Sequence, residues 1–331
     1  MKSIVFFNNK GGVGKTTLIC NLGAYLSLKK GKKVLIIDAD PQCNATQLML
    51  NDEAVNELYD KKSSFTIYSV IHPLSIGKGY SELLETMPVE SFGVDLLPGD
   101  PRLALKEDLL STDWQAATAG DVRGLRTSFL FSELLDECEE YDYVLFDVGP
   151  SLGSINRAVL LSADYFLSPM SIDIFSIRAV ENIAIALTEW QKRLQNGLSL
   201  VADDAVDDLP ENANFDIKFV GYVAQQYIQK TKEGKKRAVD SYERIMKRIP
   251  QVIRENFVER LTQPNSDIEY QIGTVANLYS LIPMSQTARK PVFALKAKDG
   301  VRGSHFSRVA DAETLYEAVS EKLFVNISKL G

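Results

Sequence analysis

A glycine-rich stretch near the amino terminus carries residues suited to binding phosphate. Residues 10–17 read KGGVGKTT, which fits the end of the general phosphate-loop pattern G-x-x-x-x-G-K-[ST], although Asn9 stands where that pattern begins with glycine. An apolar run precedes the stretch and a helical pattern follows it, so the backbone N–H groups of residues 11–16 are expected to face phosphate oxygens. The residues expected to contact a nucleotide are Gly11, Gly12, Val13, Gly14, Lys15, Thr16 and Thr17.

The side chains of this loop have separable chemistry. Lys15 would neutralise the β- and γ-phosphates, the Thr16 hydroxyl would bind Mg²⁺, and the Thr17 hydroxyl would bond to the α-phosphate. Lys10 stands five residues before Lys15. The general pattern gives this second lysine no role.

Three aspartates follow runs that are typical of buried strands. Asp38 ends KVLIID, Asp40 comes two residues later, and Asp147 ends YVLFD. Transfer of a phosphoryl group needs charge neutralisation and an oriented water, and strand ends are where such groups gather in α/β proteins. An aspartate after a strand also often caps the next helix. Three such residues beside a phosphate loop favour a catalytic and metal-binding role.

The loop sequence KGGVGKTT is the deviant form of the Walker A motif, and here the chain resembles the ParA/MinD family of P-loop ATPases. It is more similar to ParA-type partition ATPases than to MinD. The resemblance runs from about residue 3 to residue 295, and its further motifs are IDADPQCNAT (37–46), LPG (97–99), VLFDVGPSLG (144–153) and LIP (281–283).

The resemblance implies roles for individual residues, with ATP as the nucleotide and Mg²⁺ as the metal. Lys10 would reach across a dimer interface to the partner's nucleotide, in the manner of an arginine finger. Asp147 and Asp38 would lie at the Mg²⁺ with Thr16, and Asp40 would orient the attacking water. The residues expected at the adenine are Gln225, Gln226, Pro283 and Met284. ATP is preferred over GTP because the NKxD signature of GTPases is absent from the sequence.

The order of predicted elements indicates an α/β fold. Short apolar strands at 3–8, 33–38, 93–97, 143–147, 164–169, 215–223 and 278–282 alternate with helical patterns at 16–29, 128–140, 154–162, 177–195, 242–259 and 312–329. Such alternation predicts a mostly parallel, twisted sheet covered by helices on both faces. We expect one P-loop domain over residues 1–331, with surface insertions near 51–64, 111–124 and 196–214.

Charge is distributed unevenly along an acidic chain. The 331 residues carry a net charge of −7, yet a basic segment follows an acidic one at 201–216. Family resemblance and this segment together predict sequence-independent binding to DNA phosphates. The residues expected to bind DNA are Lys230, Lys232, Lys235, Lys236, Arg237, Arg244, Lys247 and Arg248. A solvated helix is the alternative reading, because Glu233, Asp240 and Glu243 dilute the segment.

Other classes of protein fit less well. No apolar run reaches the ~18 residues of a bilayer span, and the terminal segment has a mixed polar face, so a cytoplasmic, nucleoid-associated protein without membrane contact is expected. Expected partners are a second copy, bound in the presence of ATP, non-specific double-stranded DNA, and a ParB-like activator. Two alternatives stay open: an ATPase that positions a protein complex without DNA contact, and a metabolic ligase of the same fold.

Overall fold

The computed structural model describes residues 1–60, 64–76, 78–80, 84–210, 213–227, 229–232, 235–238, 240–261, 267–276, 278 and 280–331. Within these residues the core is an eight-stranded sheet in the order β10-β7-β6-β1-β5-β2-β4-β3, parallel except for the β3–β4 pair. The strands are β1 (Lys2–Phe6), β2 (Val34–Ala39), β3 (Met87–Val89), β4 (Val94–Leu97), β5 (Tyr143–Val148), β6 (Tyr165–Ser171), β7 (Lys218–Tyr227) and β10 (Gln271–Ala276).

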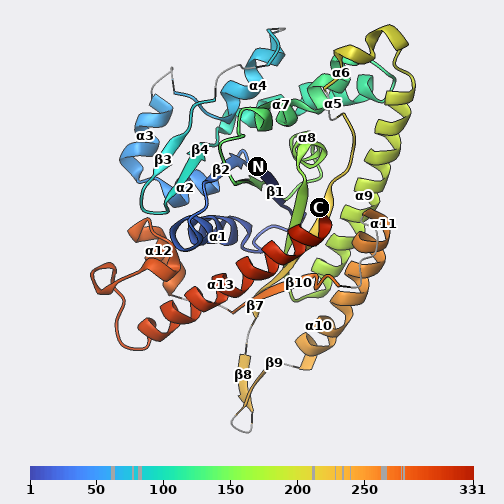
Figure 1. The fold of residues 1–331 in the computed structure, drawn as a ribbon. Helices are drawn as coiled ribbons and strands as arrows, with labels where there is room; N and C mark the ends of the chain where they lie inside the picture. The colour runs from blue at the N-terminus through green and yellow to red at the C-terminus, as the bar shows by residue number, and fades with distance from the viewer. Residues whose placement is uncertain are drawn as a thin grey trace.

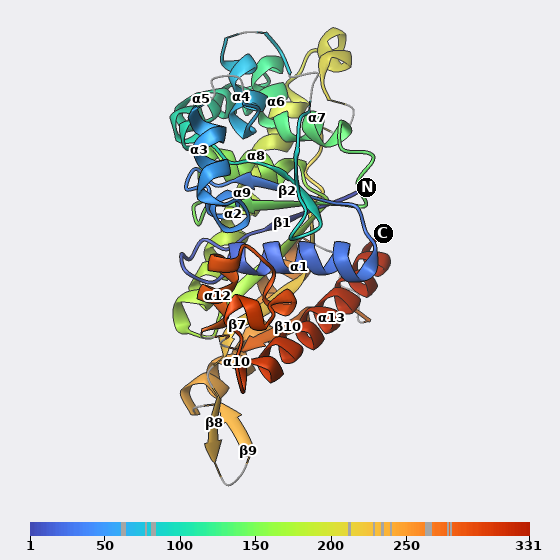
Figure 2. The ribbon, with the colours of Figure 1, turned by 90° about the vertical axis from the view of Figure 1, so that its left-hand side faces the viewer.

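Helices cover both faces of this sheet (Figures 1 and 2). One apolar cluster joins Ile4 and Phe6 of β1 to α1 (Lys15–Lys30), α2 (Asn44–Met49) and α13 (His305–Leu330). The alternate positions Val5 and Phe7 face a second cluster. The helices that contribute to it include α4 (Ile67–Ser75), α5 (Glu107–Ala117), α6 (Val122–Ser128), α7 (Leu130–Asp136), α8 (Ser154–Ser162), α9 (Ile174–Ser199) and α10 (Asp240–Ile253). The period of two along a strand therefore confirms the predicted doubly covered parallel sheet.

One predicted strand is wrong, and one predicted helix is shorter than expected. The strand predicted at 278–282 gives way to helix α12 (Leu281–Ala288), and the edge strand β10 comes earlier. The helix predicted at 128–140 is present as the shorter α7, because Ser128 still belongs to α6 and α7 ends at Asp136. The segments predicted as insertions hold α3 (Asp52–Asp60), parts of α5 and α6, and the 3-10 turn η2 (Asp203–Asp208).

After β7 the chain forms an antiparallel pair of short strands, β8 (Gln229–Lys232) and β9 (Lys235–Ala238). Both views show this pair extending away from the body of the protein (Figures 1 and 2). It leads into α10 (Asp240–Ile253), the π turn η3 (Arg254–Val258) and α11 (Glu259–Leu261). The sequence did not predict this pair of strands.

Candidate nucleotide-binding site

The phosphate loop lies at the carboxyl end of β1, between the ends of β5 and β6. Its backbone turns through left-handed conformations at Gly12 (φ 71°) and Gly14 (φ 80°), which glycine adopts without strain. Lys15 then opens α1, so the amino terminus of a 16-residue helix faces the loop. Backbone N–H groups and the positive end of the helix dipole meet at this point, and both favour an anion.

Gly14 is pressed against a side chain from a neighbouring strand. Gln225 on β7 is 5% exposed, and its Nε2 donates to the Gly14 carbonyl at 3.2 Å. A Cβ on Gly14 would lie 2.8 Å from Gln225 Oε1. Gln225 was predicted at the adenine, and the structure brings its amide onto the loop backbone. The side chain of Gln226 lies outside the described residues.

Thr16 and Asp147 form the hydroxyl–carboxylate pair expected of a Mg²⁺ site. Thr16 Oγ1 donates to Asp147 Oδ2 at 2.7 Å. Asp147 Oδ1 is buried and has no hydrogen-bond partner among the described residues. Asp38 stands opposite Asp147 in the register of β2 and β5. Hydroxyl and carboxylate oxygens are the ligands that Mg²⁺ prefers, and an orphaned carboxylate oxygen beside them fits that ion.

Burial dominates the electrostatics of these groups. It raises the pKa of Asp147, with the charge of Asp38 as the next cause. It also raises the pKa of Asp38, although hydrogen bonds from Thr46 oppose the shift. For Lys15, burial lowers the pKa against the attraction of Asp147 and Asp40. The carboxylates are therefore held in a dry environment in which a cation stabilises them strongly.

Asp40 occupies the loop between β2 and α2. It is 6% exposed, and its Oδ1 accepts from the Gln42 backbone N–H at 3.0 Å. A Cβ on Gly149, in the loop after β5, would lie 3.3 Å from the same oxygen. The structure thus brings Asp40 beside the loop that follows Asp147.

Lys10 is paired with a carboxylate from another element. Its Nζ forms an ion pair with Asp173 Oδ2, while Asp173 Oδ1 caps α9 by accepting from the Ser176 N–H at 3.0 Å. Burial alone would raise the pKa of Asp173, but the hydrogen bond from Lys10 lowers it below its ordinary value. The lysine side chain is 29% exposed.

A cavity of about 480 Å³ opens beside the first turn of α1. Thr16 and Thr17 form one wall, and side-chain amides from α2, α3 and α12 form others. Arg289 Nη2 donates to Asp52 Oδ1 at 2.9 Å and so bridges α12 to α3. No sequence pattern pointed to the amides and arginine of this cavity, Asn44, Gln47, Asn56, Gln286 and Arg289. Pro283 and Met284 lie on α12 outside its lining.

The predicted DNA-binding residues divide into two groups. The side chains of Lys230, Lys232, Lys235, Lys236 and Arg237 lie outside the described residues, while their backbone forms β8 and β9. Arg244, Lys247 and Arg248 are exposed on α10. Their i, i+3, i+4 spacing places these three cations on one face of the helix.

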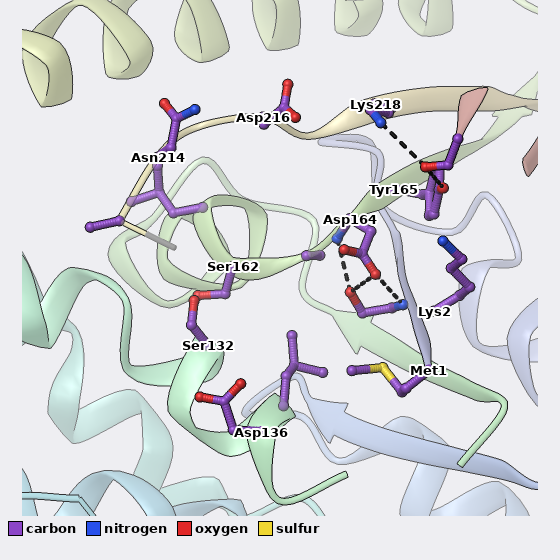
Figure 3. A pocket seen from close by; sticks show the side chains of 16 residues that line it. Met1, Lys2, Ser132, Asp136, Ser162, Asp164, Tyr165, Asn214, Asp216 and Lys218 are labelled. Atoms are coloured by element: carbon purple, nitrogen blue, oxygen red, sulfur yellow. Dashed lines mark hydrogen bonds between the residues drawn. The ribbon is translucent and has the colours of Figure 1, made fainter. Parts of the chain in front are cut away.

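A second cavity of about 480 Å³ lies at the opposite end of the sheet (Figure 3). Met1 and Lys2 at the start of β1 line it, together with Asp136, Asp164 and Lys218. The phosphate loop follows the other end of β1, so this cavity is remote from the predicted site. The Ser3 N–H donates a hydrogen bond to Asp164 Oδ2 there at 2.8 Å, and the Ser3 hydroxyl donates to the same oxygen at 2.9 Å.

Comparison with known proteins places these features in a family. A family profile described as an AAA domain matches residues 1–200. The chromosome-partitioning ATPase Soj of Treponema pallidum is 32% identical over 200 residues, which cover 60% of this chain and 66% of the relative. The aligned part thus spans slightly less than two thirds of that relative's length.

Solved structures extend the similarity over most of the chain. Protein DIP2308 from Corynebacterium diphtheriae is 33% identical, with a TM-score of 0.68 over 87% of this chain and 97% of that one. The ATP complex of Cyanothece McdA(D38A) has a TM-score of 0.65 over 98% and 96% of the two chains, at 18% identity, which supports the fold alone. Within the described part of the chain, every helix is too short or too polar to cross a membrane.

Proposed function

We propose that this chain, which belongs to the ParA/MinD family of P-loop ATPases, is an ATP-dependent dimerising switch. In this proposal it hydrolyses ATP slowly, binds DNA without sequence preference as a dimer, and partitions or positions plasmid or chromosome DNA. The single observation that carries the proposal is the arrangement of Lys15, Thr16 and Asp147 at one end of a phosphate loop.

Lys15 and the loop amides would hold the β- and γ-phosphates. Thr16 Oγ1, Asp147 Oδ1 and Asp38 are the groups that would hold Mg²⁺, directly or through water. When bound there, Mg²⁺ supplies positive charge against the β- and γ-phosphate oxygens. The low exposure of Lys15 and Asp147 supports this assignment, because charge interactions are stronger where water is excluded.

Hydrolysis requires a water placed in line with the γ-phosphorus. Its oxygen bonds to phosphorus as the bond to the bridging oxygen of ADP breaks, giving ADP and phosphate. We assign the orientation of that water to Asp40. The position of Asp40 in the loop after β2, close to Gly149 of the loop after β5, supports the assignment.

In this proposal, dimerisation depends on the second lysine of the loop, Lys10. Lys10 is paired with Asp173 at the start of α9, and its side chain is partly exposed. In the dimer we assign it to the γ-phosphate of the partner subunit's nucleotide. A cation there stabilises the dimer only while that phosphate is present, so hydrolysis releases the subunits.

The amide-lined cavity beside Thr17 is the proposed site of the sugar and base. It adjoins the residue assigned to the α-phosphate, and amide groups match the donors and acceptors on a purine edge. This placement differs from the predicted one at Gln225, Pro283 and Met284.

DNA binding is assigned to α10 and the strands that precede it. Arg244, Lys247 and Arg248 are exposed on this helix, which supports the assignment. A ParB-like, DNA-bound protein is the proposed activator, and the cytoplasmic nucleoid the proposed location.

Light scattering with ATP, ADP or no nucleotide, in the presence of Mg²⁺, tests the proposal. Wild type is expected to be dimeric with ATP and monomeric otherwise. Lys10→Ala is expected to bind ATP and stay monomeric, while Lys33→Ala, which removes another ion-paired lysine, behaves as wild type. A molecular mass that is the same with ATP, with ADP and without nucleotide would contradict the proposed switch. Dimerisation without DNA binding would favour an ATPase that positions a protein complex.

A further inference from the structure

We infer that Thr46 is the positioning residue for Asp38: its hydroxyl group fixes one carboxylate oxygen and leaves the other for the metal. The inference rests on the proposed function, in which Asp38 is a Mg²⁺ ligand. The pattern IDADPQCNAT contains Thr46, but no role was assigned to it on sequence grounds.

Two hydrogen bonds from Thr46 converge on one atom of Asp38. The Thr46 N–H donates to Asp38 Oδ2 at 2.8 Å, and the Thr46 hydroxyl donates to the same oxygen at 2.7 Å. Both residues are fully buried. Oδ1 receives one long contact, from the Asp40 N–H at 3.4 Å. The carboxylate thus has one oxygen bound to α2 and one that remains available.

The Thr46 hydroxyl group is itself held by the turn that follows β4. The Gly99 N–H donates to Thr46 Oγ1 at 2.8 Å, so the hydroxyl accepts from the turn and donates to the carboxylate. A Cβ at Gly99 would lie 2.9 Å from both Asp38 Cγ and Oδ2. The absence of a side chain at Gly99 therefore leaves room for the carboxylate where Thr46 holds it.

This arrangement joins three elements of the fold, the last of them distant in sequence from the other two. Asp38 ends β2, Thr46 lies within α2, and Gly99 follows β4. A carboxylate held in this way presents a fixed oxygen beside Asp147 without a rotational entropy loss on metal binding. Removing the hydroxyl would leave Asp38 Oδ2 short of one donor and free the side chain to turn.

Thr46→Val removes the hydroxyl and keeps the shape, while Thr46→Ser keeps the hydroxyl. The readout is the Mg²⁺ concentration for half-maximal binding of a fluorescent ADP analogue to the full chain. We expect Thr46→Val to raise it by at least about tenfold, as outer ligand partners typically do, and Thr46→Ser to lie near wild type. In EDTA, where Mg²⁺ is absent, both variants should bind the analogue with the affinity of wild type.

Thr66→Val is the matched control. Thr66 is also buried, and its hydroxyl donates at 2.8 Å to the buried carboxylate of Asp100, which is not among the proposed metal ligands. We expect it to lower the melting temperature as Thr46→Val does, while leaving the Mg²⁺ requirement unchanged. The inference would be overturned if Thr46→Val needed the same Mg²⁺ concentration as wild type. It would also be overturned if Thr46→Ser raised that concentration as much as Thr46→Val does.

Gly99→Ala keeps the test decisive if Thr46→Val does not fold. Its methyl group would press on the Asp38 carboxylate, so we expect a raised Mg²⁺ requirement, and a wild-type value would overturn the inference. Failure of the proposed function would give a different result: wild type would bind Mg²⁺ and ADP but would not dimerise with ATP.

Discussion

The ion pair between Lys10 and Asp173 ties the phosphate loop to the first turn of α9. In the proposed dimer, the lysine must leave this aspartate to reach the partner subunit's nucleotide. The contact therefore competes with dimerisation.

Asp173→Asn should release Lys10 while keeping an oxygen to cap α9. Ion pairs that are partly exposed contribute up to about 1 kcal/mol, so the ATP concentration for half-maximal dimerisation should fall by no more than about fivefold. Light scattering across an ATP titration measures it. Asp121→Asn, which alters an aspartate cap on α6, is the control and should change nothing. Weaker dimerisation of Asp173→Asn would show that the pair supports the dimer.

Gly14→Ala should abolish tight nucleotide binding. The methyl group would lie 2.8 Å from Gln225 Oε1 at a backbone φ of +80°, so the loop must shift. We expect at least a tenfold loss, about 1.4 kcal/mol, in affinity for a fluorescent ADP analogue. Gly31→Ala has a similar φ of +64° with empty space around it, and should lower stability without affecting affinity. Equal affinities for the two variants would refute the steric argument.

The sequence predicted the parts of this site that depend on local pattern. The loop glycines, Lys15 and Thr16 follow from a strand, a turn and a helix in succession, and Asp38 and Asp147 from apolar runs that end in a carboxylate. Because parallel strands bring their carboxyl ends to one edge, the meeting of Thr16 with Asp147 could also be anticipated.

Other relationships depend on packing between distant segments. The Thr46–Gly99 contact joins residues 53 positions apart, and no periodicity encodes it. Gln225 has the chemistry to read a purine, yet β7 runs close enough to the loop for its amide to meet Gly14. The strand predicted at 278–282 was wrong because a short apolar run fits a buried helix equally well.

Stability without Mg²⁺ should fall as the pH rises. The pKa values of Asp38 and Asp147 are raised in the folded protein, so the folded state holds protons that the unfolded chain releases. That stability is present at acid pH and is lost as the pH passes through the raised values. Melting in EDTA should occur at a lower temperature at about pH 8.5 than at about pH 6.

Asp147→Asn is the test of this assignment, because it removes one of the two titrating groups. The drop in melting temperature between the two pH values should become smaller in this variant. An unchanged drop would mean that other groups cause it.

Substitution of Arg244, Lys247 and Arg248 by glutamine should weaken DNA binding. Each phosphate contact contributes about 0.9 to the slope of log affinity against log salt, so the slope should decrease by up to about 3. Glutamine at Arg178, Lys192 and Arg193 removes the same charge from exposed positions on α9 and should leave the slope unchanged. Equal effects of the two triple variants would indicate a general charge effect.

Fluorescence anisotropy of a random-sequence DNA duplex tests the central claim most directly. The protein is titrated with Mg²⁺ and ATP, ADP or no nucleotide, at two salt concentrations. The account predicts binding with ATP alone, and a steep loss of affinity at the higher salt. Absence of DNA binding in every nucleotide state would contradict it, as would equal DNA affinity with ATP, with ADP and without nucleotide.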